Sequence, residues 1–197
     1  GVVRNYRKGV VLIEEGDMGD TIYLILVGKV KAFSSDAASE REITYGHYGP
    51  GEYVGELGLD GWPRAASVQT LERTCCAVVT RPLLEAHIAE HPAFAFTLLA
   101  KVISRARAAT LSARSMALND VYGRVKLLLE GEARRDAADG AGGAWWWLPA
   151  CSHRDLAARV GCSPSMVSRV WKDLETGGHV VTTPDGLRLR LPLPPRW

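Results

Sequence analysis

A carboxylate and a guanidinium stand eight residues apart in a stretch that is rich in glycine. Glu56 lies in Gly55-Glu56-Leu57-Gly58-Leu59, and Arg64 opens the segment Arg64-Ala65-Ala66. A sugar phosphate needs an acceptor for a ribose hydroxyl, a planar fork of donors for the phosphate, and backbone N–H groups that approach closely. Glu56, Arg64 and the backbone around Gly55 supply these in that order. The stretch therefore predicts a site for a cyclic nucleotide.

The same two side chains have plainer interpretations. Gly-Glu-Leu is a common tripeptide, and an isolated arginine is usually a solvated surface residue. A further alternative is that Glu56 and Arg64 pair only with each other in an otherwise empty site. The spacing of the two fragments favours the binding site.

Short apolar runs broken by glycines precede this stretch. Val10–Ile13 and Ile22–Val27 are rich in β-branched and aliphatic residues, and Gly16, Gly28 and Gly46 separate the runs. This pattern is typical of consecutive antiparallel strands joined by tight turns, and it predicts a small β-roll. Residues 55–59 are then the one helical interruption, where a phosphate meets free N–H groups.

A helical segment with an apolar seam follows, from about Pro82 to Tyr122. The seam advances by alternating steps of three and four residues, through Leu99, Val102, Ala106, Ala109, Ala113 and Met116. Such a seam is typical of a helix that packs against a partner helix, and this favours a parallel homodimer about a two-fold axis. The alternative is a helix that packs on its own domain. Lys101, Arg105, Arg107 and Arg114 lie off the seam.

The carboxyl-terminal part carries the signals of two short helices joined by a tight turn. Ser152 with Asp155 starts the first helix as a capping box, and Gly161 ends it in the left-handed conformation. Ser163 caps the second helix, and Pro164 takes its first position. This is a helix-turn-helix signature.

The second helix has one apolar and one polar face. Val167, Val170, Trp171 and Leu174 form the inward stripe, whereas Ser165, Ser168, Arg169 and Lys172 face outward. An arginine fork can read guanine O6 and N7 in the major groove, and a lysine suits phosphate. We therefore expect a DNA-binding face that also includes Ser152, His153 and Ser163. The alternative is a helical hairpin with a solvated polar face.

Two further segments flank this motif. Residues 130–144 are rich in Gly, Ala and charge and predict a flexible connection, after which Trp145-Trp146-Trp147-Leu148 predicts a short strand. Residues 179–191 predict a β-hairpin, the wing, with inward leucines and with Arg188 and Arg190 facing out.

Charge is divided unevenly along the 197 residues. Residues 1–100 hold nine Lys and Arg against thirteen Asp and Glu, whereas the remainder holds fifteen against nine. The excess of positive charge in the second half supports an anionic partner there. No apolar run reaches the length of a membrane span and no signal segment is visible, so we expect a cytoplasmic protein without a membrane partner.

The four cysteines lack the spacing of a metal or redox site. Cys75 and Cys76 are adjacent in an expected strand, and Cys151 and Cys162 flank an expected helix. No C-x-x-C pattern exists, so no metal site is expected. No nucleophile and base pair or Walker-type loop is visible either, which argues against an enzyme.

The order of β-roll, glycine-rich stretch with Glu56 and Arg64, long helix and winged helix-turn-helix resembles the cyclic AMP receptor protein (Crp/Fnr) family of bacterial transcription regulators. The likeness covers almost the whole chain, and Gly16-Asp17, Gly28-Lys29-Val30, residues 55–59, Arg64, residues 120–124 and Val160–Ser163 carry it. In that family the Glu binds ribose, the Arg binds the cyclic phosphate, and a hydroxyl on the long helix reaches the purine. The resemblance implies these roles for Glu56, Arg64 and Thr110, within a site that includes Gly55, Leu57 and Ala65.

Some positions depart from the family pattern. Ala65 stands where bacterial members often have a serine that touches phosphate, and Ala109 replaces a hydroxyl that some members present to adenine. On the recognition helix, Pro164 and Ser165 stand where well-known relatives have Arg and Glu. Ligand identity and operator sequence therefore do not carry over from the family.

These observations predict an α+β protein with three parts. They are a β-roll over 1–93, a dimerisation helix over 94–122 and a winged helix-turn-helix over 123–197. We expect a homodimeric regulator of two-fold symmetric double-stranded DNA, controlled by cyclic AMP as allosteric ligand, without another cofactor, and with RNA polymerase as a partner. The alternatives are a regulator that answers cyclic di-GMP, another small molecule or no effector, and a cyclic-nucleotide module that controls a kinase or channel.

Overall fold

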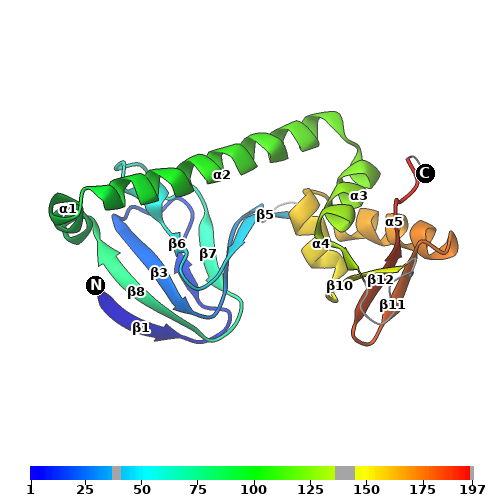
Figure 1. Ribbon diagram of the computed structural model, residues 1–197, viewed down its shortest axis with the longest axis horizontal. Coiled ribbons are helices and arrows are strands. Elements are labelled where there is room, and N and C mark those ends of the chain that lie inside the picture. Colours follow the sequence, from blue (N-terminus) through cyan, green and yellow to red (C-terminus); the bar gives the residue numbers. More distant parts are fainter. Residues whose placement is uncertain (37–40, 136–144, 196–197) are drawn as a thin grey trace. The chain divides into compact units, whose positions relative to one another are not determined.

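The computed structural model describes residues 1–36, 41–135 and 145–195, and the chain forms two compact units (Figure 1). The first unit holds residues 1–36 and 44–110, and the second holds the rest. We describe each unit by itself.

Two four-stranded sheets build the first unit. The first has the order β1 (Val2–Tyr6), β8 (Thr74–Thr80), β3 (Thr21–Val27), β6 (Tyr53–Val54), and the second has β2 (Val11–Ile13), β7 (Ser67–Thr70), β4 (Val30–Asp36), β5 (Arg41–Tyr48). β3 pairs antiparallel with β8, and β4 with β7. Buried side chains from both sheets pack into one core, made of Ile13, Ile25, Val30, Ala32, Val54, Val68 and Cys76. The predicted roll is confirmed, with β1 as an additional strand.

Three helices follow the roll. They are α1 (Arg81–Glu90), α2 (Ala93–Leu118) and α3 (Val121–Glu132). α2 ends at Leu118, short of the expected Tyr122, because Asp120 caps a new helix by accepting a hydrogen bond from the Gly123 amide at 2.7 Å. No residue of the 26-residue α2 is buried, and the apolar seam from Leu99 to Met116 is exposed.

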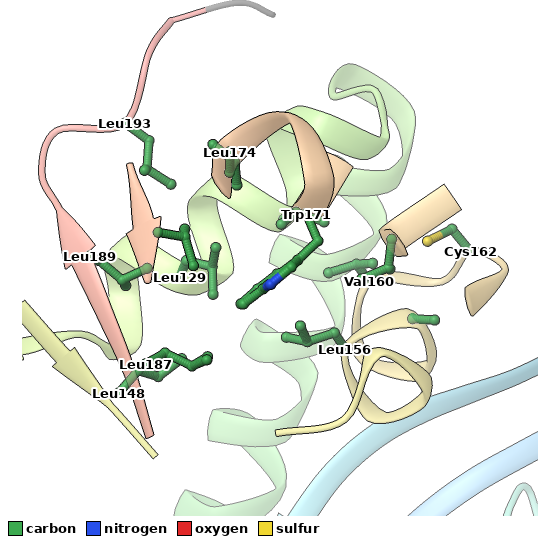
Figure 2. Packing of buried hydrophobic residues seen from close by; sticks show 14 residues of the cluster. Leu129, Leu148, Leu156, Val160, Cys162, Trp171, Leu174, Leu187, Leu189 and Leu193 are labelled. Carbon is green, nitrogen blue, oxygen red and sulfur yellow. The ribbon is translucent and has the colours of Figure 1, made fainter. Parts of the chain in front are cut away.

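The second unit packs helices against a sheet. The sheet order is β11 (Val180–Thr183), β12 (Gly186–Arg190), β10 (Trp145–Leu148), β9 (Arg134–Arg135), and the helices are α3, α4 (His153–Val160) and α5 (Pro164–Thr176). Figure 2 shows the strand leucines Leu148, Leu187 and Leu189 on the side of the core opposite α5, whose Trp171 reaches between the layers. The predicted strand at Trp145 and the predicted wing are both present.

One sequence expectation is wrong here. Residues 130–135 do not belong to a connection: the end of α3 covers Glu130 to Glu132, and β9 covers Arg134–Arg135. Leu129 is fully buried and anchors this last turn of α3 in the core, which outweighs the polar composition of the run. The rest of the expected connection, 136–144, lies outside the described residues.

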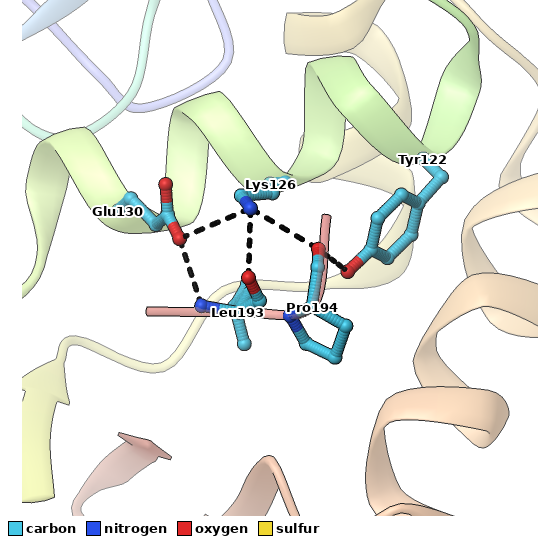
Figure 3. Close-up of polar contacts among 5 residues, drawn as sticks. All are labelled: Tyr122, Lys126, Glu130, Leu193 and Pro194. Atoms are coloured by element: carbon cyan, nitrogen blue, oxygen red, sulfur yellow. Dashed lines mark hydrogen bonds and ion pairs between the residues drawn. The ribbon is translucent and has the colours of Figure 1, made fainter. Parts of the chain in front are cut away.

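The segment after the wing is fastened to α3 by three side chains (Figure 3). Tyr122 donates to the Pro194 carbonyl at 2.7 Å, Lys126 donates to the Leu193 carbonyl at 2.7 Å, and Glu130 accepts from the Leu193 amide at 2.8 Å. These three side chains are four residues apart and so share one helix face. The Leu193 side chain is buried in the same core.

Candidate ligand site and nucleic-acid interface

The guanidinium of Arg64 is buried, with 6% of the residue exposed. It donates to the carbonyl of Gly55 at 2.6 Å, to the carbonyl of Thr21 at 2.9 Å and to the Thr21 hydroxyl at 3.2 Å. All three acceptors are neutral, and no carboxylate among the described residues forms an ion pair with Arg64. A buried cation without a counter-charge is costly. The predicted phosphate partner is thus a buried positive charge that lacks an anion.

Glycines make room for this guanidinium. A Cβ added to Gly19 would lie 2.9 Å from Nη2 of Arg64, and one added to Gly58 would lie 2.6 Å from Nη1. Gly55 has φ +94°, which only glycine adopts readily. The loop at Gly19 and the short helix η1 (Glu56–Gly58) therefore close around Arg64 only because side chains are missing there.

Glu56 pairs with a residue that the sequence analysis did not place in the site. Its carboxylate lies 2.5 Å from the guanidinium of Arg105 on α2. The alternative in which Glu56 pairs with Arg64 is wrong, since each has other partners. Sequence reasoning noticed Arg105 only as a charge off the seam. Its 49-residue separation from Glu56 left no local signal for the contact.

Arg105 also lies between two tyrosines. Its guanidinium carbon is 4.5 Å from the ring centroid of Tyr48 and 4.8 Å from that of Tyr53, and it donates to the Tyr53 carbonyl. Burial lowers the pKa of Arg105, but the hydrogen bond and charge of Glu56 outweigh this and raise it overall. For Tyr48 and Tyr53, whose charged form is an anion, burial raises the pKa. Arg105 therefore stays charged and ties α2 to the roll.

The remaining predicted ligand residues are placed as follows. Leu57, within η1, and Ala65, next to Arg64, are both exposed, and Gly55 precedes η1. Thr110 is exposed on α2, where its hydroxyl donates to the Ala106 carbonyl at 2.9 Å. The structure thus brings Gly55 and Arg64 into contact and links Glu56 to α2 through Arg105.

The helix-turn-helix forms through the predicted caps. Ser152 accepts from the Asp155 amide at 3.0 Å, and Ser163 accepts from the Met166 amide at 3.4 Å. Gly161 has φ +67° at the end of α4. In the first cap, the Asp155 carboxylate accepts from the Ser152 hydroxyl at 2.6 Å. These local contacts fix the turn between α4 and α5.

Four predicted DNA contacts share the exposed face of α5. Ser165, Ser168, Arg169 and Lys172 are all exposed, opposite the buried Val167, Trp171 and Leu174. The side chains of Arg169 and Lys172 have no hydrogen-bond or ion-pair partner in the described part of the chain. Their charges are therefore available to an anion.

The serines of this interface are less free. The Ser168 hydroxyl lies 2.9 Å from Nδ1 of His153, and that ring is 5.3 Å from Trp171. The Ser163 hydroxyl lies 2.9 Å from that of Ser165. His153, on α4, is thus held against α5 beside the expected groove-facing residues.

The wing shares an acceptor with α5. The Glu175 carboxylate accepts from Nε1 of Trp171 and from the Thr182 hydroxyl, both at 3.0 Å. Arg190 is exposed on β12, while Arg188 is partly buried. Helix α5 and the wing are therefore joined by side-chain hydrogen bonds as well as by the shared core.

Within residues 1–36, 41–135 and 145–195, no three His, Cys, Asp or Glu side chains gather as metal ligands. Among the helices described, none combines the length and hydropathy needed to cross a bilayer. The four cysteines are free thiols, and burial raises the pKa of Cys76 to about 11.

Comparison with known proteins gives matches over most of the chain. The family model of the cyclic nucleotide-binding domain matches residues 3–91. The Cyclic AMP receptor protein of Thermus thermophilus is 31% identical over 188 residues, which cover 95% of this chain and 83% of that protein. The CRP-like cAMP-activated global transcriptional regulator of Mycobacterium tuberculosis is 29% identical over 177 residues, covering 89% and 78%.

Solved structures give the same fold. The c-di-GMP-responsive global regulator CLP of Xanthomonas campestris has a TM-score of 0.81 at 24% identity, over 96% of this chain and 93% of that one. The catabolite activator protein of Thermus thermophilus has a TM-score of 0.54 at 30% identity, over 96% and 85%.

A roll followed by a winged helix-turn-helix, with these relatives, defines a transcription regulator. The chain belongs to the cyclic AMP receptor protein (Crp/Fnr) family. The Mycobacterium tuberculosis relative is named as a global transcriptional regulator.

Proposed function

We propose that this regulator is a homodimer whose DNA binding is controlled by a cyclic nucleotide, with cyclic AMP as the effector. Residues 1–93 bind the ligand, residues 94–122 hold the dimer together, and residues 123–197 bind a two-fold symmetric duplex. RNA polymerase is its partner at the promoter. Relatives named as cAMP-activated support this choice of ligand.

The observation that carries the proposal is the uncompensated charge of Arg64. A cyclic phosphate brings one negative charge and oxygens that suit a guanidinium fork. Within the described residues, Nε of Arg64 donates no hydrogen bond. A phosphate oxygen can therefore accept from Nε without displacing a protein acceptor. Neutralising the buried cation favours the bound state.

The ribose end supports a link to α2. Glu56 is the expected acceptor for a ribose hydroxyl, and it already holds Arg105. A ligand hydroxyl at Glu56 therefore changes the surroundings of the side chain that joins α2 to the roll. A ligand shifts the arrangement of the helices only as far as it binds one arrangement better than the other.

The dimer rests on the exposed seam of α2. Of its members, Leu99 is 51% exposed, Val102 38% and Met116 37%, on a helix with no buried residue. An apolar stripe of this length is stabilised by a second copy of the same helix. A two-fold dimer then presents two α5 helices to half-sites about 34 Å apart.

Calorimetry tests the ligand. Cyclic AMP, cyclic GMP and cyclic di-GMP are titrated into the wild type, into Arg64→Ala and into Arg73→Ala, whose arginine is exposed. Cyclic AMP should bind the wild type and Arg73→Ala but not Arg64→Ala, with circular dichroism confirming that all three are folded. If only cyclic di-GMP bound, it would be the effector in place of cyclic AMP. If no nucleotide bound, the proposed sensor function would be wrong.

Duplexes selected from a random pool, with and without cyclic AMP, test the output. The selected sites should have two-fold symmetry, and the nucleotide should raise affinity for them. Equal affinity with and without the nucleotide would contradict allosteric control while leaving DNA binding intact.

A further inference from the structure

The sheet of the second unit has an outer face built from arginine and tryptophan. In antiparallel pairs, directly opposite residues share a face, and faces alternate along each strand. Trp145 pairs with Arg190, and Trp147 pairs with both Arg188 and Arg134. These five residues therefore lie on one face, which we name the Arg/Trp face.

The opposite face of the sheet is the one that the core uses. Leu148, Leu187, Leu189 and Val180 alternate with the residues of the Arg/Trp face and are all buried. The Arg/Trp face is therefore directed away from the core. Arg134 and Arg190 are exposed, and the neighbouring Val181, paired with Arg188, is 43% exposed.

The Arg/Trp face is positive and aromatic at once. Its five positions hold three guanidinium groups and two indoles, with no lysine and no carboxylate. The guanidinium carbon of Arg190 lies 4.7 Å from the Trp145 ring centroid, within cation–π distance, and Trp145 and Trp147 are both partly exposed. The face thus combines charge for an acidic partner with flat apolar area.

The core separates this face from the recognition helix. Val167, Trp171 and Leu174 of α5 pack into the same cluster as Leu187 and Leu189 of β12, and Figure 2 shows Trp171 and Leu174 facing those leucines. Because the Arg/Trp face is the other side of the sheet, it lies across this cluster from α5. A duplex seated on the exposed side of α5 lies across the core from the Arg/Trp face. This leaves the face open to another molecule while DNA is bound.

We propose that the Arg/Trp face is a docking surface for an acidic protein segment that also carries apolar side chains. Tryptophan and arginine are enriched and lysine is depleted in the cores of protein interfaces, and the two former dominate their binding energy. Duplex DNA would engage the guanidinium groups but leave the indoles unused, because its bases are stacked inside. The inference rests on the proposed function only in assigning DNA to α5.

The test uses the full chain and a fluorescein-labelled peptide of repeated Glu-Glu-Phe, with the Gln-Gln-Phe peptide as its neutral counterpart. Fluorescence anisotropy gives the dissociation constants. Arg134→Gln/Arg190→Gln should raise the dissociation constant of the acidic peptide about tenfold. Trp145→Ala should raise it by a similar factor. Lys8→Gln/Arg73→Gln removes the same charge from exposed positions of the first unit and should leave binding unchanged.

Affinity for the selected duplex is measured on the same variants. It should be unchanged in the arginine variant, and a wild type that binds no duplex would count against the proposed function and not against the docking surface. Three results would overturn the inference: equal weakening in the two double variants, equal binding of the neutral peptide, or no change with either Arg/Trp variant. A loss of duplex affinity with a salt slope lower by about two would assign the face to DNA. A changed sedimentation coefficient would assign it to a second copy.

Discussion

The two cationic sites of this regulator treat charge in opposite ways. Arg64 is buried in the roll and donates to neutral carbonyls, whereas Arg169 and Lys172 project from α5 without a partner in the described chain. A buried cation favours one ligand of fixed shape, because any anion must fit within a closed set of backbone groups. An exposed cation accepts many phosphates and is screened by salt. The first arrangement suits a site that responds to one ligand, and the second suits a surface that binds DNA.

The largest expected effect is on the buried site. Arg64→Lys keeps the charge but loses the planar fork and the two-point geometry. We expect cyclic AMP affinity to fall by about 2–5 kcal/mol, the usual cost of disrupting a buried charge pair. Calorimetry measures it, with Arg73→Lys as control. An affinity within a factor of two of wild type would show that charge alone suffices there.

Arg169→Gln tests the exposed site. Loss of a bidentate contact to guanine should cost about 1–3 kcal/mol at one base pair and relax selection at that position. Binding curves on the selected operator and on its single-base variants measure this. Lys172→Gln should weaken all duplexes alike and lower the salt slope by about one. If the two variants behave identically, Arg169 contacts only phosphate.

Gly58→Ala asks how closely the roll fits its guanidinium. The new Cβ would lie 2.6 Å from Nη1 of Arg64 and 2.5 Å from the Gly19 carbonyl, so we expect a loss of about 1–3 kcal/mol in unfolding free energy. Denaturant unfolding measures it. Gly131→Ala is the matched control, because it meets nothing within 4 Å on α3 and should gain up to about 1 kcal/mol. Equal stability of Gly58→Ala and wild type would mean that the Gly19 loop and Arg64 shift to accommodate the new methyl group.

The smallest effect concerns a second buried ionisable group of the roll. Burial raises the pKa of the Cys76 thiol from 9.0 to about 11. Because the raised pKa means that the folded state holds its proton more tightly, this contribution is complete below pH 9 and is lost as pH rises through about 11. Wild type should therefore lose more stability than Cys76→Ala between these limits. Parallel pH profiles of thermal unfolding would show whether it does.

What the sequence could predict follows from how local each contact is. Ser163, Pro164 and Gly161 act within a few residues of themselves, so the turn of the helix-turn-helix could be identified from spacing alone. The alternation of apolar runs and glycines was sufficient for the roll. Asp120 was visible as a residue but not as the start of α3, since the helical segment was expected to continue to Tyr122.

The contacts that sequence could not supply are those between distant residues. Arg105 meets Glu56 only because the roll places η1 beside α2. The three-point attachment of Leu193 and Pro194 to α3 likewise joins residues more than sixty positions apart. Both depend on tertiary packing, which no periodicity encodes.

The attachment at Leu193 and Pro194 has a thermodynamic consequence for the carboxyl-terminal unit. It ties the strand end of the winged motif to α3, the helix with which that motif begins, so neither edge can fray without first breaking bonds made by the other. Such a closed arrangement melts as one block. In hydrogen exchange, amides of α3 and β12 should then open together, at the free energy of the unit as a whole.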